Sequence, residues 1–393
     1  MYNPISISDA VYYVGVNDRR SPLFENQIPL PYGVSYNSYL VVDDKTALID
    51  TVEIACFETF VKKIESIIAD RPIDYLIINH MEPDHSGALR LIKSRYPQIR
   101  LVGNRRTKEM VEGYFGISDD FVEINESSVL DLGKRQLQFF LTPMVHWPET
   151  MMTYDSQHKI LFSGDAFGCF GALNGGVTDE DLSLDIFWDE MRRYYACIVG
   201  KYGAPVQNAL AKLQAIDIAC LCPTHGPVWK KQIHDVMADY DRYSRYESES
   251  GVVIAYGSMY GNTEQMAEAI AEGLVSEGVK NVALYDVAKT DSSYILSDIF
   301  RYKGLIVGSP TYMNDILPAV DSLLRKIETR TVKNRVFASF GSCSWAAASV
   351  KRIAAIVESL QWETVGAVEE KHALKAEKYA ECVSLGKKMA AAL

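Results

Sequence analysis

The strongest constraint on the fold is the alternation of short apolar runs with amphipathic segments over the last third of the chain. Apolar runs of strand length occur at 252–256, 282–287, 304–308 and 336–340. Segments with helical spacing lie between and after them, at 263–276, 293–301, 318–327, 346–360 and 373–391. Strands that alternate with helices usually pair in parallel and are covered on both faces. The pattern therefore predicts a doubly wound parallel sheet.

The turn after the first of these strands has the composition of a phosphate-binding loop. Residues 257–263 lead directly into a helix, whose free N–H groups and positive end attract an anion. The loop lacks the Walker lysine and the dinucleotide Gly-x-Gly-x-x-Gly pattern, so it suits a single phosphate monoester. The loops after two later strands, 308–314 and 341–345, would wall a flat ring at the same sheet edge. The candidate contacts are Ser258, Met259, Tyr260, Gly261, Asn262, Thr263, Ser309, Pro310, Thr311, Tyr312, Asn314, Gly341, Ser342, Cys343, Ser344 and Trp345.

From residue 251 onward the sequence resembles a flavodoxin domain, and the ligand of that family is flavin mononucleotide (FMN). The resemblance implies that the three loops bind FMN. A generic turn capped by Ser and Thr would explain one such loop, but not three loops in register. Taken singly, Tyr312 and Trp345 are more often packing residues than flavin contacts.

The first 250 residues read as mixed strands and helices, with potential metal ligands at the strand ends. We expect a hairpin over 39–49, a helix over 57–69 and buried strands at 73–78, 159–162 and 218–222. Four candidate ligands follow the first buried strand within six residues, and three more are spread downstream. These ligands are His80, Glu82, Asp84, His85, His146, Asp165 and His225.

The ligand spacing resembles that of the metallo-β-lactamase fold, an αββα sandwich whose motif reads His-x-His-x-Asp-His followed by spaced His, Asp and His. Position 82 is Glu where the zinc hydrolases carry His. The added carboxylate makes the site harder and more anionic, which favours iron or manganese over zinc. Two ferrous ions would bring four positive charges against the three carboxylates Glu82, Asp84 and Asp165, and a bridging hydroxide would neutralise the remainder.

Such a domain, with Glu at position 82 and a flavodoxin domain after it, resembles the flavodiiron proteins (A-type flavoproteins). The resemblance implies two non-haem irons per chain. One iron would take His80, Glu82 and His146, the other would take Asp84, His85 and His225, and Asp165 would bridge them. In some relatives the histidine that matches His85 points away from the metal.

The family reduces dioxygen to water, nitric oxide to nitrous oxide, or both, and the resemblance implies this activity here. We expect a separate electron donor, either a rubredoxin-like protein or a reduced deazaflavin coenzyme. Family members form head-to-tail homodimers, so we expect a homodimer or a dimer of dimers, with Trp147 as a candidate contact with the partner's flavin. Tyr194 and Tyr195 are candidate proton or hydrogen-bond donors near the irons. For all three aromatic residues, core packing is the alternative interpretation.

Two other functions are alternatives to this one. A zinc-dependent hydrolase of the metallo-β-lactamase superfamily, fused to a flavodoxin module, is disfavoured by Glu82. A non-catalytic electron carrier or gas sensor would need only the flavin domain and would leave the metal ligands unexplained. The sequence does not rank dioxygen against nitric oxide.

Net charge, apolar runs and cysteine content limit which partners and which cellular compartment are expected. The net charge of −11 argues against nucleic acid held by phosphate contacts, and no apolar run is long enough to cross a membrane. Seven scattered cysteines and the lack of a signal-peptide pattern favour a reducing cytoplasm. Cys220 and Cys222 are expected on one face of a strand, as small buried hydrophobes. The charged segment 239–250 is predicted to be a helix that frays into a linker, which divides the chain into 1–249 and 250–393.

Overall fold

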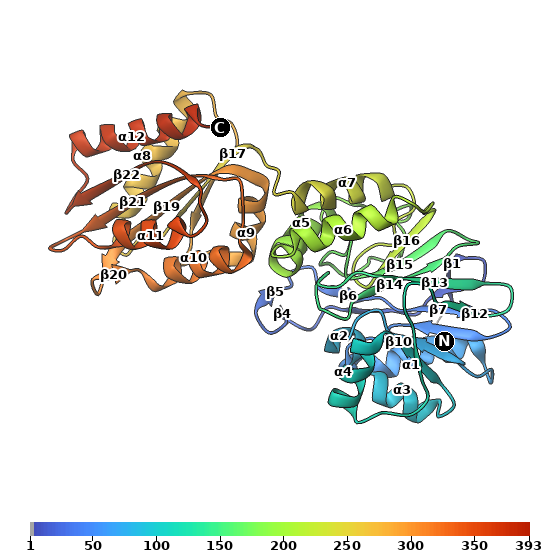
Figure 1. Ribbon diagram of the computed structural model, residues 1–393. Coiled ribbons are helices and arrows are strands. Elements are labelled where there is room, and N and C mark those ends of the chain that lie inside the picture. Colours follow the sequence, from blue (N-terminus) through green and yellow to red (C-terminus); the bar gives the residue numbers. More distant parts are fainter. Residues whose placement is uncertain (1–3) are drawn as a thin grey trace. The chain divides into compact units, whose positions relative to one another are not determined.

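The computed structural model describes residues 4–393, which form two compact units (Figure 1). The N-terminal unit runs to Tyr195 and continues with Tyr202–Asp241. The C-terminal unit comprises Arg242–Leu393 together with the short segment Ala196–Lys201. The domain boundary expected at 249/250 stays a prediction.

Two sheets form the centre of the N-terminal unit. The larger has the strand order β1-β2-β7-β8-β9-β10-β11, with bounds Ile5–Ser8, Val11–Tyr13, Tyr39–Val42, Thr46–Ile49, Tyr75–Ile77, Arg100–Gly103 and Phe121–Glu123. The smaller has the order β12-β13-β14-β15-β16, with bounds Val129–Asp131, Gln136–Leu141, Met151–Asp155, Ile160–Gly164 and Cys220–Pro223. Two ribbons complete the strands, β3 (Val16–Asp18) with β6 (Val34–Tyr36), and β4 (Leu23–Phe24) with β5 (Ile28–Pro29).

Helices cover the outer faces of these two sheets (Figure 1). In α1, apolar residues spaced four apart, Phe60, Ile64 and Ile68, form one buried stripe, as expected for a helix packed on a sheet. The predicted αββα architecture is therefore confirmed. The remaining elements of this unit are the 3₁₀ turn Ile54–Cys56 and the helices α1 (Phe57–Ile68), α2 (Pro83–Ser86), α3 (Leu89–Arg95), α4 (Arg105–Phe115), α5 (Phe187–Tyr194), α6 (Gly203–Leu213) and α7 (Ile233–Ser244). A π-helix at Tyr195–Val199 follows α5 and lies mostly in the short segment that belongs to the C-terminal unit.

The C-terminal unit contains the predicted doubly wound parallel sheet. Its strand order is β18-β17-β19-β21-β22, all in parallel, with β20 paired to the end of β19. The strands are β17 (Glu249–Tyr256), β18 (Val282–Asp286), β19 (Tyr302–Tyr312), β20 (Asp315–Ile316), β21 (Val336–Cys343) and β22 (Glu363–Lys371). The helices are α8 (Asn262–Ser276), α9 (Ser292–Arg301), α10 (Pro318–Arg330), α11 (Ser349–Glu358) and α12 (Ala376–Ala391).

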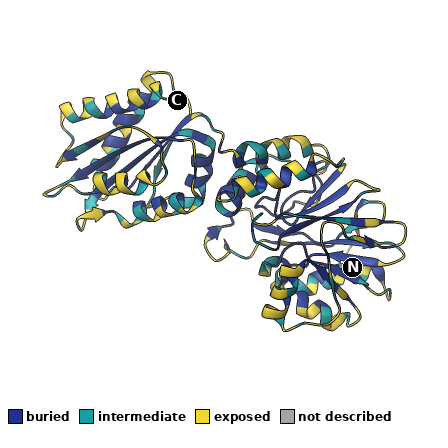
Figure 2. Cartoon of the chain, viewed as in Figure 1, coloured by how far each residue is buried: buried dark blue, intermediate teal, exposed yellow. Residues whose placement is uncertain are grey.

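Close helix packing covers one face of this sheet. Helices α8 and α12 lie side by side (Figure 1), and a Cβ on Gly273 would stand 2.2 Å from the carbonyl oxygen of Val383. A Cβ on Gly386 would meet the carbonyl oxygen of Ile270 at the same distance. Glycine at both places therefore allows the two backbones to touch. The central strands of the sheets are buried, and the outward sides of the helices are exposed (Figure 2).

One strand was missed: β22 is largely exposed at the sheet edge and carries glutamates and Gly366 in place of an apolar run. The prediction for segment 239–250, a helix followed by a linker, is confirmed, although the linker is short: α7 ends at Ser244 and β17 begins at Glu249. The prediction for Cys220 and Cys222 is confirmed: both are buried in β16, with their Sγ atoms 3.7 Å apart.

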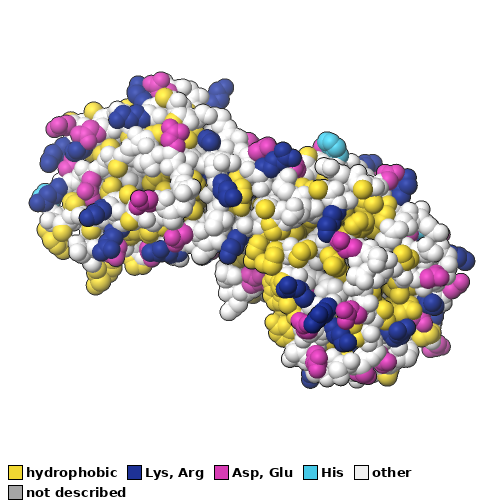
Figure 3. Space-filling view, in the orientation of Figure 1, with side chains coloured by type: hydrophobic (Ala, Val, Ile, Leu, Met, Phe, Trp, Pro, Cys, Tyr) yellow, Lys and Arg dark blue, Asp and Glu magenta, His cyan; other side chains and the backbone are white. Residues whose placement is uncertain are grey.

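Within residues 4–393, no helix combines the length and the apolar character needed to cross a bilayer. On the face drawn in Figure 3, basic and acidic side chains are intermixed, without a continuous basic stripe.

Candidate functional site

The fold gathers all seven predicted metal ligands into two adjoining groups. The first, the Glu82 group, consists of His80, Glu82, His146 and Asp165. The second, the Asp84 group, consists of Asp84, His85 and His225. Within each group, one ligand atom from every residue lies within 4.8 Å of the others. His85 therefore turns into the cluster.

Asp165 faces both groups at once. Its Oδ2 lies 3.1 Å from His146 Nε2 and 3.4 Å from His80 Nε2, in the Glu82 group. Its Oδ1 lies 2.9 Å from His85 Nε2, in the Asp84 group. A carboxylate with one oxygen directed at each group is suited to bridge two cations.

Several buried polar atoms in the cluster have no hydrogen-bond partner. They are both carboxylate oxygens of Asp84, both ring nitrogens of His85, His225 Nε2 and Asp165 Oδ2. Buried polar atoms are normally satisfied, and each one left unsatisfied costs about 1–3 kcal/mol. Bound cations would satisfy these atoms together, so the residues present fit a pair of metal ions.

The end of a neighbouring strand holds the ligand motif in place. Strand β8 ends at Ile49, and the next residue, Asp50, accepts hydrogen bonds at Oδ1 from Asn79 N (2.8 Å) and His80 N (3.3 Å). Thr51 Oγ1 donates to the carbonyl of His85 at 2.6 Å. Asp50 and Thr51 therefore hold the ligand motif by hydrogen bonds near both of its ends. Neither residue was predicted to do so from the sequence.

Two of the four histidines are oriented from behind by hydrogen bonds. His80 Nδ1 lies 2.8 Å from Glu149 Oε1, and His225 Nδ1 lies 2.8 Å from the carbonyl oxygen of Ser35. Such contacts fix the tautomer and turn Nε2 towards the metal. Neither partner was predicted from the sequence, although the position of Glu149 three residues after His146 was a usable signal.

In this cluster, opposite charges shift the pKa values of the ligands more than burial does. Burial alone would lower the pKa values of His146 and His85, but nearby carboxylates raise both to about 9. For His146 these are chiefly Asp165 and Glu82. For His85 they are chiefly Asp84 and Asp165. Burial would raise the pKa of Asp165, yet His85 and His80 hold it well below its usual range. The metal-free cluster therefore retains protons, and cation binding would release them.

The three predicted aromatic neighbours take different places. Tyr194 is fully buried, its ring centroid lies 5.5 Å from that of His225, and its hydroxyl has no hydrogen-bond partner. Tyr195 is also buried and packs edge-on against Tyr240 at 5.1 Å, as a core residue does. Trp147 is half-buried, with its ring perpendicular to that of His80 at 5.3 Å.

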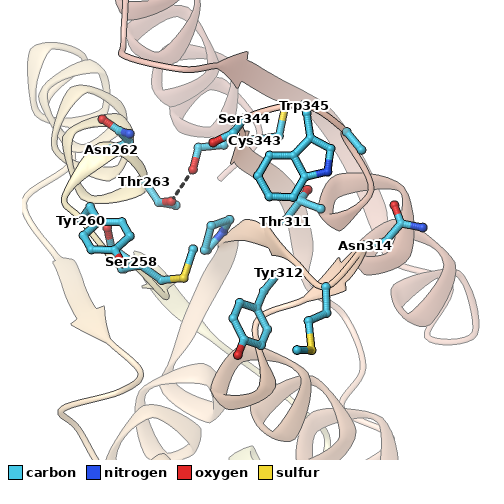
Figure 4. A pocket seen from close by; sticks show the side chains of 15 residues that line it. Ser258, Tyr260, Asn262, Thr263, Thr311, Tyr312, Asn314, Cys343, Ser344 and Trp345 are labelled. Atoms are coloured by element: carbon cyan, nitrogen blue, oxygen red, sulfur yellow. Dashed lines mark hydrogen bonds between the residues drawn. The ribbon is translucent and has the colours of Figure 1, made fainter.

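A second site, a cavity of about 430 Å³, lies at the carboxyl ends of β17, β19 and β21. Figure 4 shows side chains from three loops around it, with Ser258, Tyr260 and Thr263 from the first loop and Trp345 from the third. The predicted residues that line it are Ser258, Met259, Tyr260, Asn262, Thr263, Pro310, Thr311, Tyr312, Asn314, Ser342, Cys343, Ser344 and Trp345. Met313 and Ala346 also line it and were not predicted.

Three predicted contacts do not line the cavity. Gly261 has a φ of 92° at the start of α8, and its N–H donates to Ser258 Oγ at 3.0 Å, so it shapes the turn. Ser309 is buried, and its hydroxyl accepts from Leu317 N. A Cβ on Gly341 would stand 2.8 Å from Ser349 Oγ, so this glycine permits close packing behind the loop.

Comparisons with known proteins agree with this geometry. Residues 34–226 match the family described as ODP family beta lactamase, and residues 254–386 match the flavodoxin family. The chain is 32% identical to the nitric oxide reductase of Moorella thermoacetica, with 100% of this chain and 99% of that protein covered.

Two solved structures are similar over nearly the whole chain. The rubredoxin oxygen:oxidoreductase of the anaerobe Desulfovibrio gigas superposes with a TM-score of 0.96 at 30% identity, with 99% of this chain and 98% of that chain covered. The flavodiiron protein from Giardia intestinalis superposes with a TM-score of 0.95 at 25% identity, with 100% and 97% covered.

Proposed function

Because this chain belongs to the flavodiiron proteins, a family of oxidoreductases, we propose that it reduces dioxygen to water, nitric oxide to nitrous oxide, or both. The observation that carries the proposal is the carboxylate of Glu82 inside the metal cluster, with Oε2 3.0 Å from His146 Nε2 and 3.3 Å from His80 Nε2. A carboxylate at this position favours iron over zinc. It therefore favours redox chemistry over zinc-dependent hydrolysis.

The chain's own residues define how two irons would be held. The Glu82 group would bind one ion and the Asp84 group the other, with Asp165 between them. Glu82 and Asp84 are each 13% exposed at the side chain, whereas the four histidines are almost fully buried. The two carboxylates therefore mark the open side of the cluster, from which a small gas would approach.

FMN fits the cavity of the C-terminal unit. The first turn of α8 and the loop before it present N–H groups and the hydroxyls of Ser258 and Thr263 to a phosphate. The cavity volume of about 430 Å³ lies within the usual range for small-molecule sites. Tyr312 and Trp345, on the second and third loops, would border the ring (Figure 4).

When bound, two ferrous ions and a reduced flavin supply the four electrons that dioxygen needs, or two electrons for a pair of nitric oxide molecules. Protons must come from the protein or from water. Burial and the nearby carboxylates, Asp165 foremost, raise the pKa of Tyr194 well above its usual value, so its hydroxyl keeps its proton. We therefore assign Tyr194 the role of hydrogen-bond donor to the bound substrate.

The flavin cavity and the metal cluster belong to different compact units, and large apolar side chains are exposed at the cavity. Tyr260, Met313 and Trp345 are 92%, 86% and 89% exposed. We propose that a second copy of the chain covers this rim in a head-to-tail dimer, which brings its irons to the flavin. The donor would be a rubredoxin-like protein, in keeping with the name of the Desulfovibrio relative, or a reduced deazaflavin coenzyme.

The test combines metal analysis with turnover. Protein produced with adequate iron should contain two irons and one FMN per chain, and with an excess of chemical reductant present it should consume dioxygen or nitric oxide repeatedly. Stopped-flow oxidation by each gas would rank the two substrates. Two tightly bound zinc ions together with hydrolytic activity, or a single oxidation without turnover, would contradict the proposal.

A further inference from the structure

Glu149 is a buried carboxylate that stands directly behind one metal-binding histidine. It is 1% exposed, and its Oε1 lies 2.8 Å from His80 Nδ1 and accepts from Met81 N at 2.9 Å. Asn104 Nδ2 donates to the Glu149 backbone carbonyl at 2.6 Å. Side chain and backbone are thus both held, so the carboxylate has little freedom to leave His80.

The contact determines which ring nitrogen of His80 can bind a metal. A carboxylate accepts hydrogen bonds, so His80 keeps a proton on Nδ1, and Nε2 is the nitrogen left to bind a metal. His80 Nε2 is the atom that lies 3.3 Å from Glu82 Oε2 and 3.4 Å from Asp165 Oδ2. The hydrogen bond therefore presets the tautomer and the ring orientation that a metal at the Glu82 group requires.

In the Asp84 group, neither histidine has a carboxylate hydrogen-bonded to its Nδ1 atom. His225 Nδ1 faces the neutral carbonyl oxygen of Ser35, and His85 Nδ1 is buried without a hydrogen-bond partner. A carboxylate behind a ligating histidine increases the basicity of that ligand, and it adds a negative charge close to the ion. Among the described residues, that combination occurs only on the Glu82 side of the pair.

We propose that Glu149 is a positioning residue that makes the Glu82 group the tighter of the two metal sites. The inference rests on the proposed metal pair, but it does not require that the ions be iron or that the protein reduce a gas. Loss of a partner of this kind typically lowers metal affinity by about 10–100-fold. Here we expect that loss at one of the two sites.

The experiment is an anaerobic titration of the metal-free full-length protein with Co²⁺, whose visible absorption and binding heat report each site. Wild type should bind two ions. Glu149→Gln, which keeps the size and the hydrogen-bonding capacity but removes the charge, should weaken one ion by about 10-fold or more. Glu149→Ala should weaken the same ion at least as much, and its Co²⁺ spectrum should change with it.

Two single-site backgrounds identify which ion is affected. In His225→Ala, the ion that remains should be weakened by Glu149→Gln. In His146→Ala, adding Glu149→Gln should change the affinity by less than about threefold, because the side-chain hydrogen bonds of Glu149 go to His80 and Met81 and to no residue of the Asp84 group. The matched control is Glu370→Gln, a buried carboxylate of the C-terminal unit that also has an unpartnered oxygen, and it should bind Co²⁺ as wild type does.

Each outcome separates this inference from the proposed function. Equal weakening of both ions, with a lowered midpoint of thermal unfolding, would show a general structural role and overturn the inference. Unchanged binding in Glu149→Gln would also overturn it and leave the metal pair intact. A wild type that binds fewer than two Co²⁺ ions would overturn the metal pair, and the inference with it.

Discussion

Thr263 offers a direct test of how FMN is held. Its hydroxyl lies at the start of α8, is 1% exposed, and is 2.9 Å from Ser342 Oγ, as the dashed line in Figure 4 marks. A hydroxyl can accept one hydrogen bond and donate another. With Ser342 as the donor, Thr263 remains free to donate to the phosphate. Thr263→Val removes this donor, together with the acceptor for Ser342, and nearly preserves the shape of the side chain.

One net hydrogen bond contributes about 0.5–1.5 kcal/mol, which corresponds to a roughly 2- to 13-fold weaker Kd. Titration of the flavin-free protein, followed by quenching of flavin fluorescence, measures this change. Thr263→Ser keeps the hydroxyl and should bind FMN nearly as wild type does. Riboflavin, which lacks the phosphate, should bind both variants equally. Equal weakening of FMN and riboflavin by Thr263→Val, or no weakening at all, would refute the assignment.

Three further predictions concern the metal cluster and its partner. Glu82→His should shift the metal content from iron to zinc and abolish gas reduction, as elemental analysis and gas-consumption assays would show; retained iron and activity would contradict this. Tyr194→Phe should leave the thermal stability of the metal-free protein unchanged or raised, because the hydroxyl has no partner there, while turnover falls by about 100-fold through loss of the hydrogen bond to the bound substrate; unchanged turnover would show that Tyr194 only packs. His80→Ala and Gly261→Asp should each inactivate their own homodimer, yet mixed dimers should recover part of the activity if electrons cross between chains; inactive mixed dimers, with an active wild-type monomer, would place the transfer within one chain.

Local patterns in the sequence located most elements of the C-terminal unit. The apolar run at 252–256 and the helical spacing at 263–276 are properties of neighbouring residues, so they can be recognised without knowledge of the fold. Strand β22 was not predicted, because its exposed residues need no apolar pattern and its hydrogen bonds are made with the neighbouring strand β21. An edge strand is defined by its neighbour more than by its own composition.

The chemical type of the candidate metal site follows from local residue identity. His80, Glu82, Asp84 and His85 lie within six residues after a buried strand, and their residue types alone point to a hard, anionic centre. The tertiary structure decided how that centre is supported. Asp50 and Glu149 reach the motif from about 30 and 70 positions away along the chain. Hydrogen bonds between such distant residues depend on how sheets and loops pack, and no local periodicity encodes that packing.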